Sequence, residues 1–288
     1  MKYFLDSAKL DEIKLAYNTF GIDGVTTNPR HIMLSGKPFL TAITDIANWI
    51  KEEGLEGYEK FPVSVEINPH LDDTEEMIAA AKKVSAISEN FVIKIPCTEA
   101  GVAAARRLEK EGIRTNVTLV FSPAQAIWPA KNGSLFVSPF LGWKEANGED
   151  CKQYIKDIVD IYKNYGFYGK TQIICAAIRT PKQIVDCAVA GADIVTTGLA
   201  VYQDAIKHAY TRQGIETFIN AWDNTASWAS PCAKTLSRSM TTPFTASISS
   251  PQKWSCWPPR ARFPARTRWS WPRSPTSSSR WCPNPSTP

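Results

Sequence analysis

The 288-residue sequence lacks any run of about 18 apolar residues, the length that a membrane-spanning helix needs. Its N-terminus, MKYFLDSAKLDE, reaches an acidic residue at its sixth position, so it has no apolar signal-peptide core. No CxxC pair occurs among the seven cysteines, and His31, His70 and His208 stand in unlike contexts without metal-ligand spacing. We therefore expect a cytoplasmic protein with reduced thiols, no membrane partner, no metal and no cofactor.

Acidic residues are absent from residues 227–288, which hold nine Lys and Arg, whereas residues 1–226 hold 24 Lys and Arg against 28 Asp and Glu. The net charge of +5 is therefore the sum of +9 and −4. The basic segment also lacks Gly and Val but holds 11 of the 20 prolines, six of the ten tryptophans and 14 serines. Such a segment cannot bury enough aliphatic surface to offset its ordering entropy. We predict a folded domain over residues 1–226 and a disordered basic tail over residues 227–288.

The basic tail has two interpretations. A segment rich in Arg and Trp can bind RNA or an acidic surface, which makes such binding the non-enzymatic hypothesis for this protein. A stretch rich in Arg, Pro, Ser and Trp and without acids also resembles translation in a wrong reading frame. We favour the frameshift interpretation, so nucleic acid is not an expected partner.

Within the first 226 residues, short β-rich runs alternate with amphipathic helical stretches. The β-rich runs cover residues 2–6, 24–28, 63–68, 92–96, 116–120, 136–141, 172–178 and 193–198. Eight strand–helix units in about 225 residues predict an α/β fold, a closed (β/α)8 TIM barrel. An open doubly wound sheet is the alternative, but its usual GxGxxG loop after the first strand is missing.

Polar residues gather at the C-terminal ends of the predicted strands, where barrels of this kind carry their active sites. The first seven strands contribute candidates: Asp6, Asn28, Glu66, Asn68, Lys94, Asn116, Thr118, Ser138 and Arg179. Taken singly, each has an ordinary explanation. Asp6 can cap a helix that starts near Ser7, Asn28 can be a turn residue before a proline, and Glu66 can form a barrel salt bridge. Taken together, they predict a polar site at one mouth.

Lys94 is the sharpest candidate because apolar residues surround it in the run VIKIP. One alternative is a lysine that protects a sheet edge, but a closed barrel has no edge. Another is a buried ion pair with Asp6 or Glu66. The functional interpretation is a nucleophile, since an apolar pocket lowers the pKa of an amine and so activates it toward a carbonyl.

Six segments together resemble the transaldolase family, including its fructose-6-phosphate aldolase-like branch. They are LDSA, DGVTTNP, VIKIPCTEAG, GIRTNVTLVFSPAQA, SPFLGW and ADIVTTG, and the resemblance runs from about Lys2 to Thr225. It implies a (β/α)8 barrel and metal-free aldol chemistry through a Schiff base. It also implies small sugar substrates and a homo-oligomer.

The resemblance assigns roles to individual positions. Lys94 matches the Schiff-base lysine, and Asp6 matches the carboxylate that handles the proton of the C4 hydroxyl. Glu66 matches an acid–base that works through a water molecule with Thr118. The residues that match substrate-contacting positions are Asn28, Asn116 and Ser138.

Two departures from the family pattern concern the terminal anion of the substrate. Trp143 stands where phosphate-sugar transaldolases usually carry Arg, and Ala177 stands where they carry Ser, while Arg179 is kept. Losing two donors weakens a phosphate site. The strings DGVTTNPRHIM, SVEINPHL and SPFLGWKE look like the sulfofructose transaldolases of sulfoglycolysis. A sulfonate with its single charge suits fewer donors, here Trp143 with Arg30, Lys144 or Arg179.

The leading hypothesis is a transaldolase that moves a dihydroxyacetone unit from 6-deoxy-6-sulfofructose to glyceraldehyde 3-phosphate or glyceraldehyde and releases 3-sulfolactaldehyde. An ordinary transaldolase or a fructose-6-phosphate aldolase is the nearest alternative. Glu66 favours transaldolase, because the aldolase branch tends to carry Gln at that position.

Overall fold

The computed structural model describes residues 1–225. The predicted basic tail over residues 227–288 lies outside the described residues, and the boundary at residue 226 stays a prediction. Met1–Asn224 forms one unit. Among the described helices, none is long and apolar enough to cross a membrane.

Eight parallel strands form a closed barrel in the order of the sequence, and β8 pairs with β1 to close it. They are β1 (Lys2–Asp6), β2 (Gly24–Thr26), β3 (Val63–Glu66), β4 (Phe91–Pro96), β5 (Thr115–Val120), β6 (Phe136–Pro139), β7 (Gln172–Ile178) and β8 (Ile194–Thr197). The predicted (β/α)8 barrel is confirmed, and every strand starts within one residue of its predicted start. Several strands end earlier than predicted, because residues such as Asn28 leave the sheet to cap the next helix.

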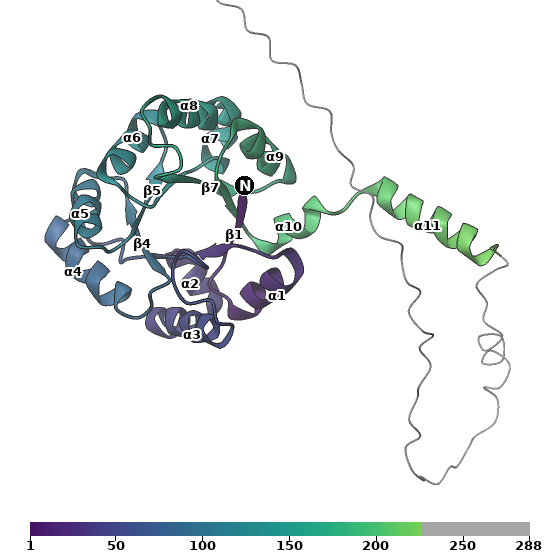
Figure 1. Cartoon of the computed structure of the whole chain (residues 1–288), viewed down its shortest axis with the longest axis horizontal. Helices are drawn as coiled ribbons and strands as arrows, with labels where there is room; N and C mark the ends of the chain where they lie inside the picture. Colours follow the sequence, from purple (N-terminus) through teal and green to yellow (C-terminus); the bar gives the residue numbers. More distant parts are fainter. Residues whose placement is uncertain (226–288) are drawn as a thin grey trace, which may run out of the picture. The chain divides into compact units, whose positions relative to one another are not determined.

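Helices follow the strands, and all of the described helices except the last surround them as an outer ring, which Figure 1 shows along the barrel axis. Those between β1 and β5 are α1 (Leu10–Phe20), α2 (Pro29–Ser35), α3 (Phe39–Glu52), α4 (Thr74–Ser85) and α5 (Glu99–Lys110). Those after β5 are α6 (Pro123–Asn132), α7 (Gly142–Ala146), α8 (Cys151–Asn164), α9 (Pro181–Ala190), α10 (Leu199–Ala205) and α11 (Ala209–Asp223). Side-chain caps fix several of their starts. Asp73 accepts bonds from two backbone amides of α4, and Thr98 accepts one from Gly101 of α5.

The inside of the barrel is divided into an apolar layer and a polar layer. One buried apolar cluster consists of Phe4, Val92, Phe136, Ile174 and Ile194. The rings of Phe4 and Phe136 meet edge to face in it, with 5.8 Å between their centroids. Because side chains alternate along a strand, the residues two positions further on point to the same side. Those residues are Asp6, Lys94, Ser138, Ala176 and Thr196. The buried apolar cluster therefore lies directly below the polar residues at the mouth of the barrel.

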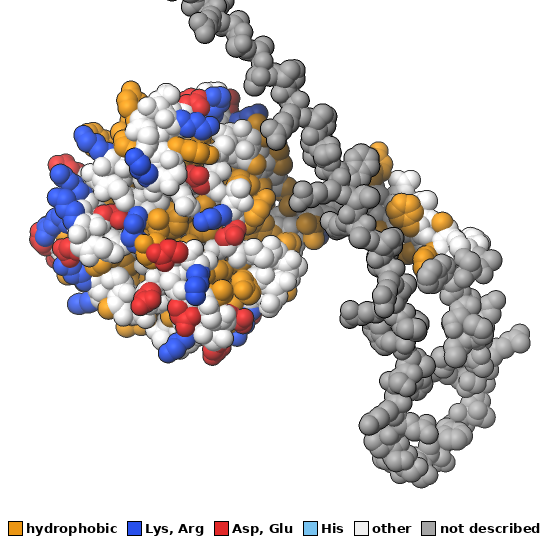
Figure 2. All heavy atoms as spheres, in the orientation of Figure 1, with side chains coloured by type: hydrophobic (Ala, Val, Ile, Leu, Met, Phe, Trp, Pro, Cys, Tyr) orange, Lys and Arg blue, Asp and Glu red, His pale blue; other side chains and the backbone are white. Residues whose placement is uncertain are grey.

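The outer surface mixes charges of both signs. Lys and Arg side chains are interspersed with Asp and Glu over the face of the barrel that Figure 2 displays. Helix α11 differs from the barrel helices in having no buried residue, and its large apolar side chains, among them Phe218 and Trp222, are exposed.

Candidate active site

Lys94 lies near the end of β4 with its side chain only 4% exposed. Its Nζ is 3.1 Å from Oε2 of Glu66 on the neighbouring strand β3, and it donates to the backbone carbonyl of Thr27 at 3.2 Å. Of the alternatives left by the sequence, the structure shows the ion pair with Glu66. The pair offsets the cost of burying the charge, and it holds the amine in one place inside the barrel.

Asp6, the last residue of β1, has both carboxylate oxygens occupied. Oδ1 accepts a bond from the Thr26 hydroxyl at 2.8 Å, and Oδ2 lies 3.1 Å from Nε2 of His31. Burial raises the pKa of the Asp6 carboxyl, but the hydrogen bond and charge of His31, with the charge of Lys94 and the Thr26 bond, outweigh it and lower this pKa. The helix-cap alternative does not hold, because α1 begins at Leu10 after Lys9 and has no side-chain cap.

Asn116 and Ser138 form a buried hydrogen-bonded chain across the sheet. Ser138 Oγ donates to Asn116 Oδ1 at 2.7 Å, and Asn116 Nδ2 donates to Ser64 Oγ at 2.9 Å. Thr118 is also fully buried, yet its hydroxyl has no partner in the described part of the chain. A buried hydroxyl without a partner is costly, so this atom is suited to bind a water molecule or a substrate group.

A cavity of about 400 Å³ lies at the mouth of the barrel. Eight residues predicted from the sequence line it: Asp6, Asn28, Arg30, Glu66, Lys94, Ser138, Trp143 and Arg179. Asn28 has a structural role as well, because its Oδ1 accepts the backbone amide of His31 at 3.0 Å and so caps α2. The two carboxylates and the amine therefore share one cavity with two arginines.

Arg179 and Trp143 form the part of the rim contributed by β7 and α7. A Cβ added to Gly142 would lie 2.4 Å from the Ala177 carbonyl and 3.0 Å from Nε of Arg179, so the Arg179 side chain packs directly against this glycine. Trp143 is 53% exposed. Its ring stacks on the Phe121 ring with 5.6 Å between the centroids, and it makes a T-shaped contact with the Phe140 ring. Trp143 is thus a packed rim aromatic that also faces the cavity.

Lys144 is the predicted anion-binding residue that the structure places elsewhere. It does not line the mouth cavity, because its ammonium pairs with Glu149 and lies 5.0 Å from the ring centroid of Tyr154. The sequence placed it next to Trp143, but adjacent residues of a helix point in different directions. Its charge is already compensated.

His31 and Leu119 are among the cavity residues that sequence reasoning did not predict, and Ala177 was named only as a departure from the family pattern. His31 was set aside for lack of metal spacing, although its place in the first turn after β2 was a signal that it lies at the mouth. Leu119 and Ala177 both have a left-handed backbone with φ of 57°, at the bulges where β5 and β7 lose register with β6 and β8. Strained backbone of this kind gathers at functional sites, but neither Leu nor Ala indicates it in a sequence.

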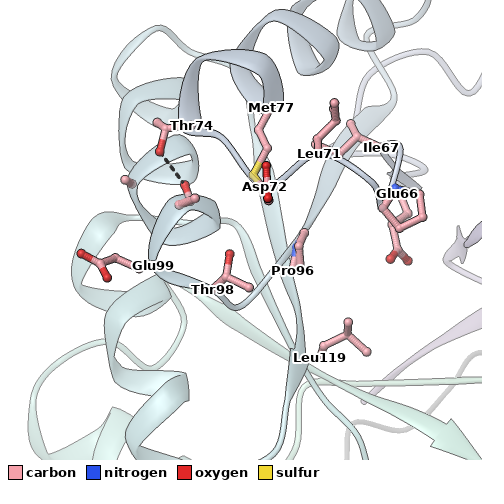
Figure 3. Close-up of a pocket in the computed structure, with 13 residues that line it drawn as sticks. Glu66, Ile67, Leu71, Asp72, Thr74, Met77, Pro96, Thr98, Glu99 and Leu119 are labelled. Atoms are coloured by element: carbon pink, nitrogen blue, oxygen red, sulfur yellow. Dashed lines mark hydrogen bonds between the residues drawn. The ribbon is translucent and has the colours of Figure 1, made fainter.

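A second cavity, of about 700 Å³, lies between the starts of α4 and α5 and shares Glu66 and Leu119 with the first. Figure 3 shows its lining, with the Thr74 hydroxyl bonded to the Ala100 carbonyl above it. Asp72 and Glu99 join Glu66 there, and no Lys or Arg among residues 1–225 lines it. The two cavities therefore differ in charge on the two sides of Glu66. An anionic group is favoured only in the cavity that holds Arg30 and Arg179.

Comparisons with known proteins identify the family of the chain. A sequence model described as "Transaldolase/Fructose-6-phosphate aldolase" matches residues 3–249. Two curated proteins named "6-deoxy-6-sulfo-D-fructose transaldolase", from Priestia aryabhattai and Priestia megaterium, are each 59% identical over 229 residues, which cover 80% of this chain and 98% of theirs. A "Probable transaldolase" of Coprothermobacter proteolyticus is 43% identical over 222 residues, covering 77% of this chain and 96% of its own. The chain therefore belongs to the transaldolase/fructose-6-phosphate aldolase family.

Proposed function

We propose that this chain is a Schiff-base transaldolase that transfers a dihydroxyacetone unit from 6-deoxy-6-sulfofructose to glyceraldehyde 3-phosphate or glyceraldehyde, releasing 3-sulfolactaldehyde. The observation that carries the proposal is the buried pair of Lys94 and Glu66, 3.1 Å apart, in a cavity that also holds Asp6 and two arginines. The 59% identity to proteins named for this reaction supports the choice of donor.

The reaction begins with the transfer of a proton from the Lys94 ammonium to the Glu66 carboxylate beside it. The neutral Nζ then attacks C2 of the ketose. The C2 oxygen takes one proton from Nζ and a second proton back from Glu66, and it leaves as water. The product is an iminium ion on Lys94. The unpartnered Thr118 hydroxyl, together with Glu66, is suited to hold that water.

Cleavage of the C3–C4 bond follows. The bonding electron pair moves into the iminium group and gives an enamine, while the C4 hydroxyl proton moves to Asp6 and C4 becomes an aldehyde carbon. After the aldehyde leaves, the enamine carbon bonds to the carbonyl carbon of the acceptor, whose oxygen takes the proton from Asp6. Hydrolysis of the new iminium ion frees the product ketose and Lys94. Asn28, Asn116 and Ser138 hold the dihydroxyacetone hydroxyls.

The terminal anion of the donor binds at the cationic part of the cavity. Arg30 and Arg179 supply the charge, and the indole N–H of Trp143 supplies a neutral donor. A sulfonate carries one negative charge where a phosphate carries nearly two, so this set of donors satisfies a sulfonate more completely. Lys144 has no part in this proposal, since its ammonium pairs with Glu149.

Covalent trapping tests the chemistry. Wild-type protein incubated with 6-deoxy-6-sulfofructose and then reduced with borohydride is expected to carry a three-carbon adduct on Lys94, identified by peptide mass spectrometry. Lys94→Arg keeps a cation beside Glu66 but cannot form an imine, so it is expected to carry none and to lose activity by at least about 10⁴-fold. An adduct on a different lysine would contradict the proposal.

Donor competition tests the specificity. With glyceraldehyde 3-phosphate as acceptor, sulfofructose is expected to be cleaved with a higher kcat/KM than fructose 6-phosphate. The opposite order would make the protein an ordinary transaldolase, which the two cavity arginines also allow. Release of free dihydroxyacetone without an acceptor would make it a fructose-6-phosphate aldolase.

We also propose a cytoplasmic location and a homo-oligomeric state. The four described cysteines, Cys97, Cys151, Cys175 and Cys187, are free thiols, as is typical of a reducing compartment. Light scattering of the purified protein tests the oligomeric state. Binding of nucleic acid through residues 227–288 lies outside the described residues.

A further inference from the structure

His31 is a titratable residue of the mouth cavity that the mechanism above does not use. It lies in the first turn of α2, with its side chain 23% exposed, and its Nε2 is 3.1 Å from Oδ2 of Asp6. Its backbone amide is tied to the Asn28 side chain at 3.0 Å, and Pro29 at the first helical position fixes the chain just before it. Both the ring and the backbone of His31 are therefore held.

The charged groups around the pair come from β3, β4, α2 and the end of β7. Lys94 on β4 contributes positive charge at Asp6, and Glu66 on β3 compensates Lys94. Arg30, adjacent on α2, and Arg179 after β7 line the same cavity. Thr26 on β2 bonds to Asp6 and also to Thr196 on β8, 2.6 Å away, so the oxygen of Asp6 opposite to His31 is fixed as well.

We propose, building on the function proposed above, that His31 is a positioning residue that holds Asp6 as an oriented carboxylate and thereby sets the low-pH limit of carbon–carbon bond cleavage. Asp6 accepts the C4 hydroxyl proton only while it is ionised. The bond from Nε2 occupies Oδ2 on the α2 side and keeps the carboxyl plane between Thr26 and His31.

The same contact explains how Asp6 stays ionised in spite of its burial. Burial raises the pKa of the Asp6 carboxyl, and the hydrogen bond and the charge of His31 are the two largest opposing effects. Removing His31 therefore leaves burial less opposed and raises the pKa of Asp6. The group then becomes protonated at a higher pH and stops accepting the proton there.

The decisive experiment compares His31→Leu and His31→Gln with wild type in the cleavage of sulfofructose across pH. His31→Leu removes both the donor and the charge, so the acidic limb of kcat/KM is expected to move up by about one to two pH units. His31→Gln keeps a hydrogen-bond donor without a titrating charge and is expected to fall between the two. His70→Leu, on an exposed residue outside the mouth cavity, is the matched control and is expected to leave the profile in place.

Two further measurements separate this inference from the proposed function. Borohydride trapping of Lys94 with free dihydroxyacetone needs no C4 proton transfer, so it is expected to be normal in both His31 variants. A ¹³C NMR titration of the Asp6 carboxyl, assigned with Asp6→Asn, is expected to show a higher pKa in His31→Leu whatever the substrate is.

The outcomes are distinct. The role of His31 would be overturned if folded His31→Leu showed the same Asp6 pKa and the same acidic limb of kcat/KM as wild type. If His31→Leu does not fold, the same two results in His31→Gln would overturn it. Failure to trap Lys94 in the wild type would instead overturn the proposed function, while the Asp6 titration would still decide the contact with His31.

Discussion

The two ends of the barrel use carboxylates in opposite ways. At the N-terminal end, Asp23, Glu109 and Asp193 accept backbone amides at the starts of strands, from Tyr3, from Thr115 and Leu135, and from Ile173. At the C-terminal mouth, the contacts that Asp6 and Glu66 make are with the side chains of Thr26, His31 and Lys94. Backbone amides cannot give up their protons, whereas a histidine and a lysine can. In the mechanism proposed above, the carboxylates of one end therefore hold strand register and those of the other end transfer protons.

The direction of the pKa shifts follows this division. Burial raises the pKa of Glu109 and of Asp193, and the amide bonds oppose it only in part. The pKa of Asp6 is lowered in spite of its burial, because His31 and Lys94 bring positive charge to its carboxylate. The pKa of an aspartate is thus raised at the N-terminal end and lowered at the mouth.

The largest expected contrast comes from matched Asp→Asn substitutions at the two ends. Asp6→Asn removes the group that takes the C4 proton, so kcat for sulfofructose is expected to fall about 10² to 10⁴-fold, with trapping of dihydroxyacetone on Lys94 retained. Asp193→Asn keeps an oxygen that can accept the Ile173 amide, so its kcat is expected to match wild type. A similar loss of kcat in both variants would show that the ends are not functionally separate.

A second contrast lies within the N-terminal end, at Glu109. Its Oε1 accepts the amide and the hydroxyl of Thr115 and the amide of Leu135, while Oε2 pairs with Arg114. Glu109→Ala leaves three donors without an acceptor and is expected to lower the free energy of unfolding by about 3 kcal/mol or more. Glu109→Gln keeps the Oε1 bonds and is expected to lose much less. Urea unfolding measures both, and equal losses would show that the Arg114 pair, not the three bonds, stabilises this end.

The dependence of stability on pH is expected to have opposite signs at the two ends. The pKa of Glu109 is raised in the folded state above the ordinary glutamate value of 4.5, so the folded protein binds more protons there than the unfolded chain. The free energy of unfolding is therefore expected to fall as the pH rises above 4.5 and Glu109 ionises. Asp6, whose folded pKa is lowered, adds stability above its ordinary value of 3.8, which is lost as the pH falls through the folded pKa.

Urea midpoints measured from pH 3 to pH 7 check these signs. Relative to wild type, Glu109→Gln is expected to gain stability as the pH rises above 4.5, because it lacks the raised carboxyl. Asp6→Asn is expected to lose stability relative to wild type as the pH rises through 3.8. If the urea midpoints of the two variants changed with pH in parallel, the expected electrostatic difference between the two ends would be wrong.

The sequence was sufficient to predict the barrel and much of its mouth. Alternation of strand and helix patterns located all eight strands. The two-residue period of a strand places Lys94, Asp6 and Ser138 on the inner side of the barrel, together with the buried apolar cluster. Proximity in the sequence misled in the case of Lys144, because the direction of a side chain on α7 depends on helix rotation and on its partner Glu149. The His31 contact depends on the spatial approach of α2 to β1, which no local pattern encodes.

Backbone strain at the mouth offers the smallest predicted effect and tests the contrast in a different way. Ala177 and Leu119 hold a left-handed conformation at φ 57°, which costs a non-glycine residue roughly 1–2 kcal/mol. Ala177→Gly is expected to remove that cost and, after the entropy of glycine in the unfolded chain, to raise the free energy of unfolding by up to about 1 kcal/mol. Ala176→Gly, one residue away and without a left-handed backbone, is the control and is expected to lower it by about 0.5–1 kcal/mol.

Activity then decides what the strain is for. If the bulge in β7 serves to aim Arg179 into the cavity, Ala177→Gly is expected to raise KM for the anionic donor even as it raises stability, because a glycine there fixes the following residues less firmly. An unchanged KM would show that the strained backbone at the mouth, unlike the carboxylates there, is only a consequence of closing the barrel.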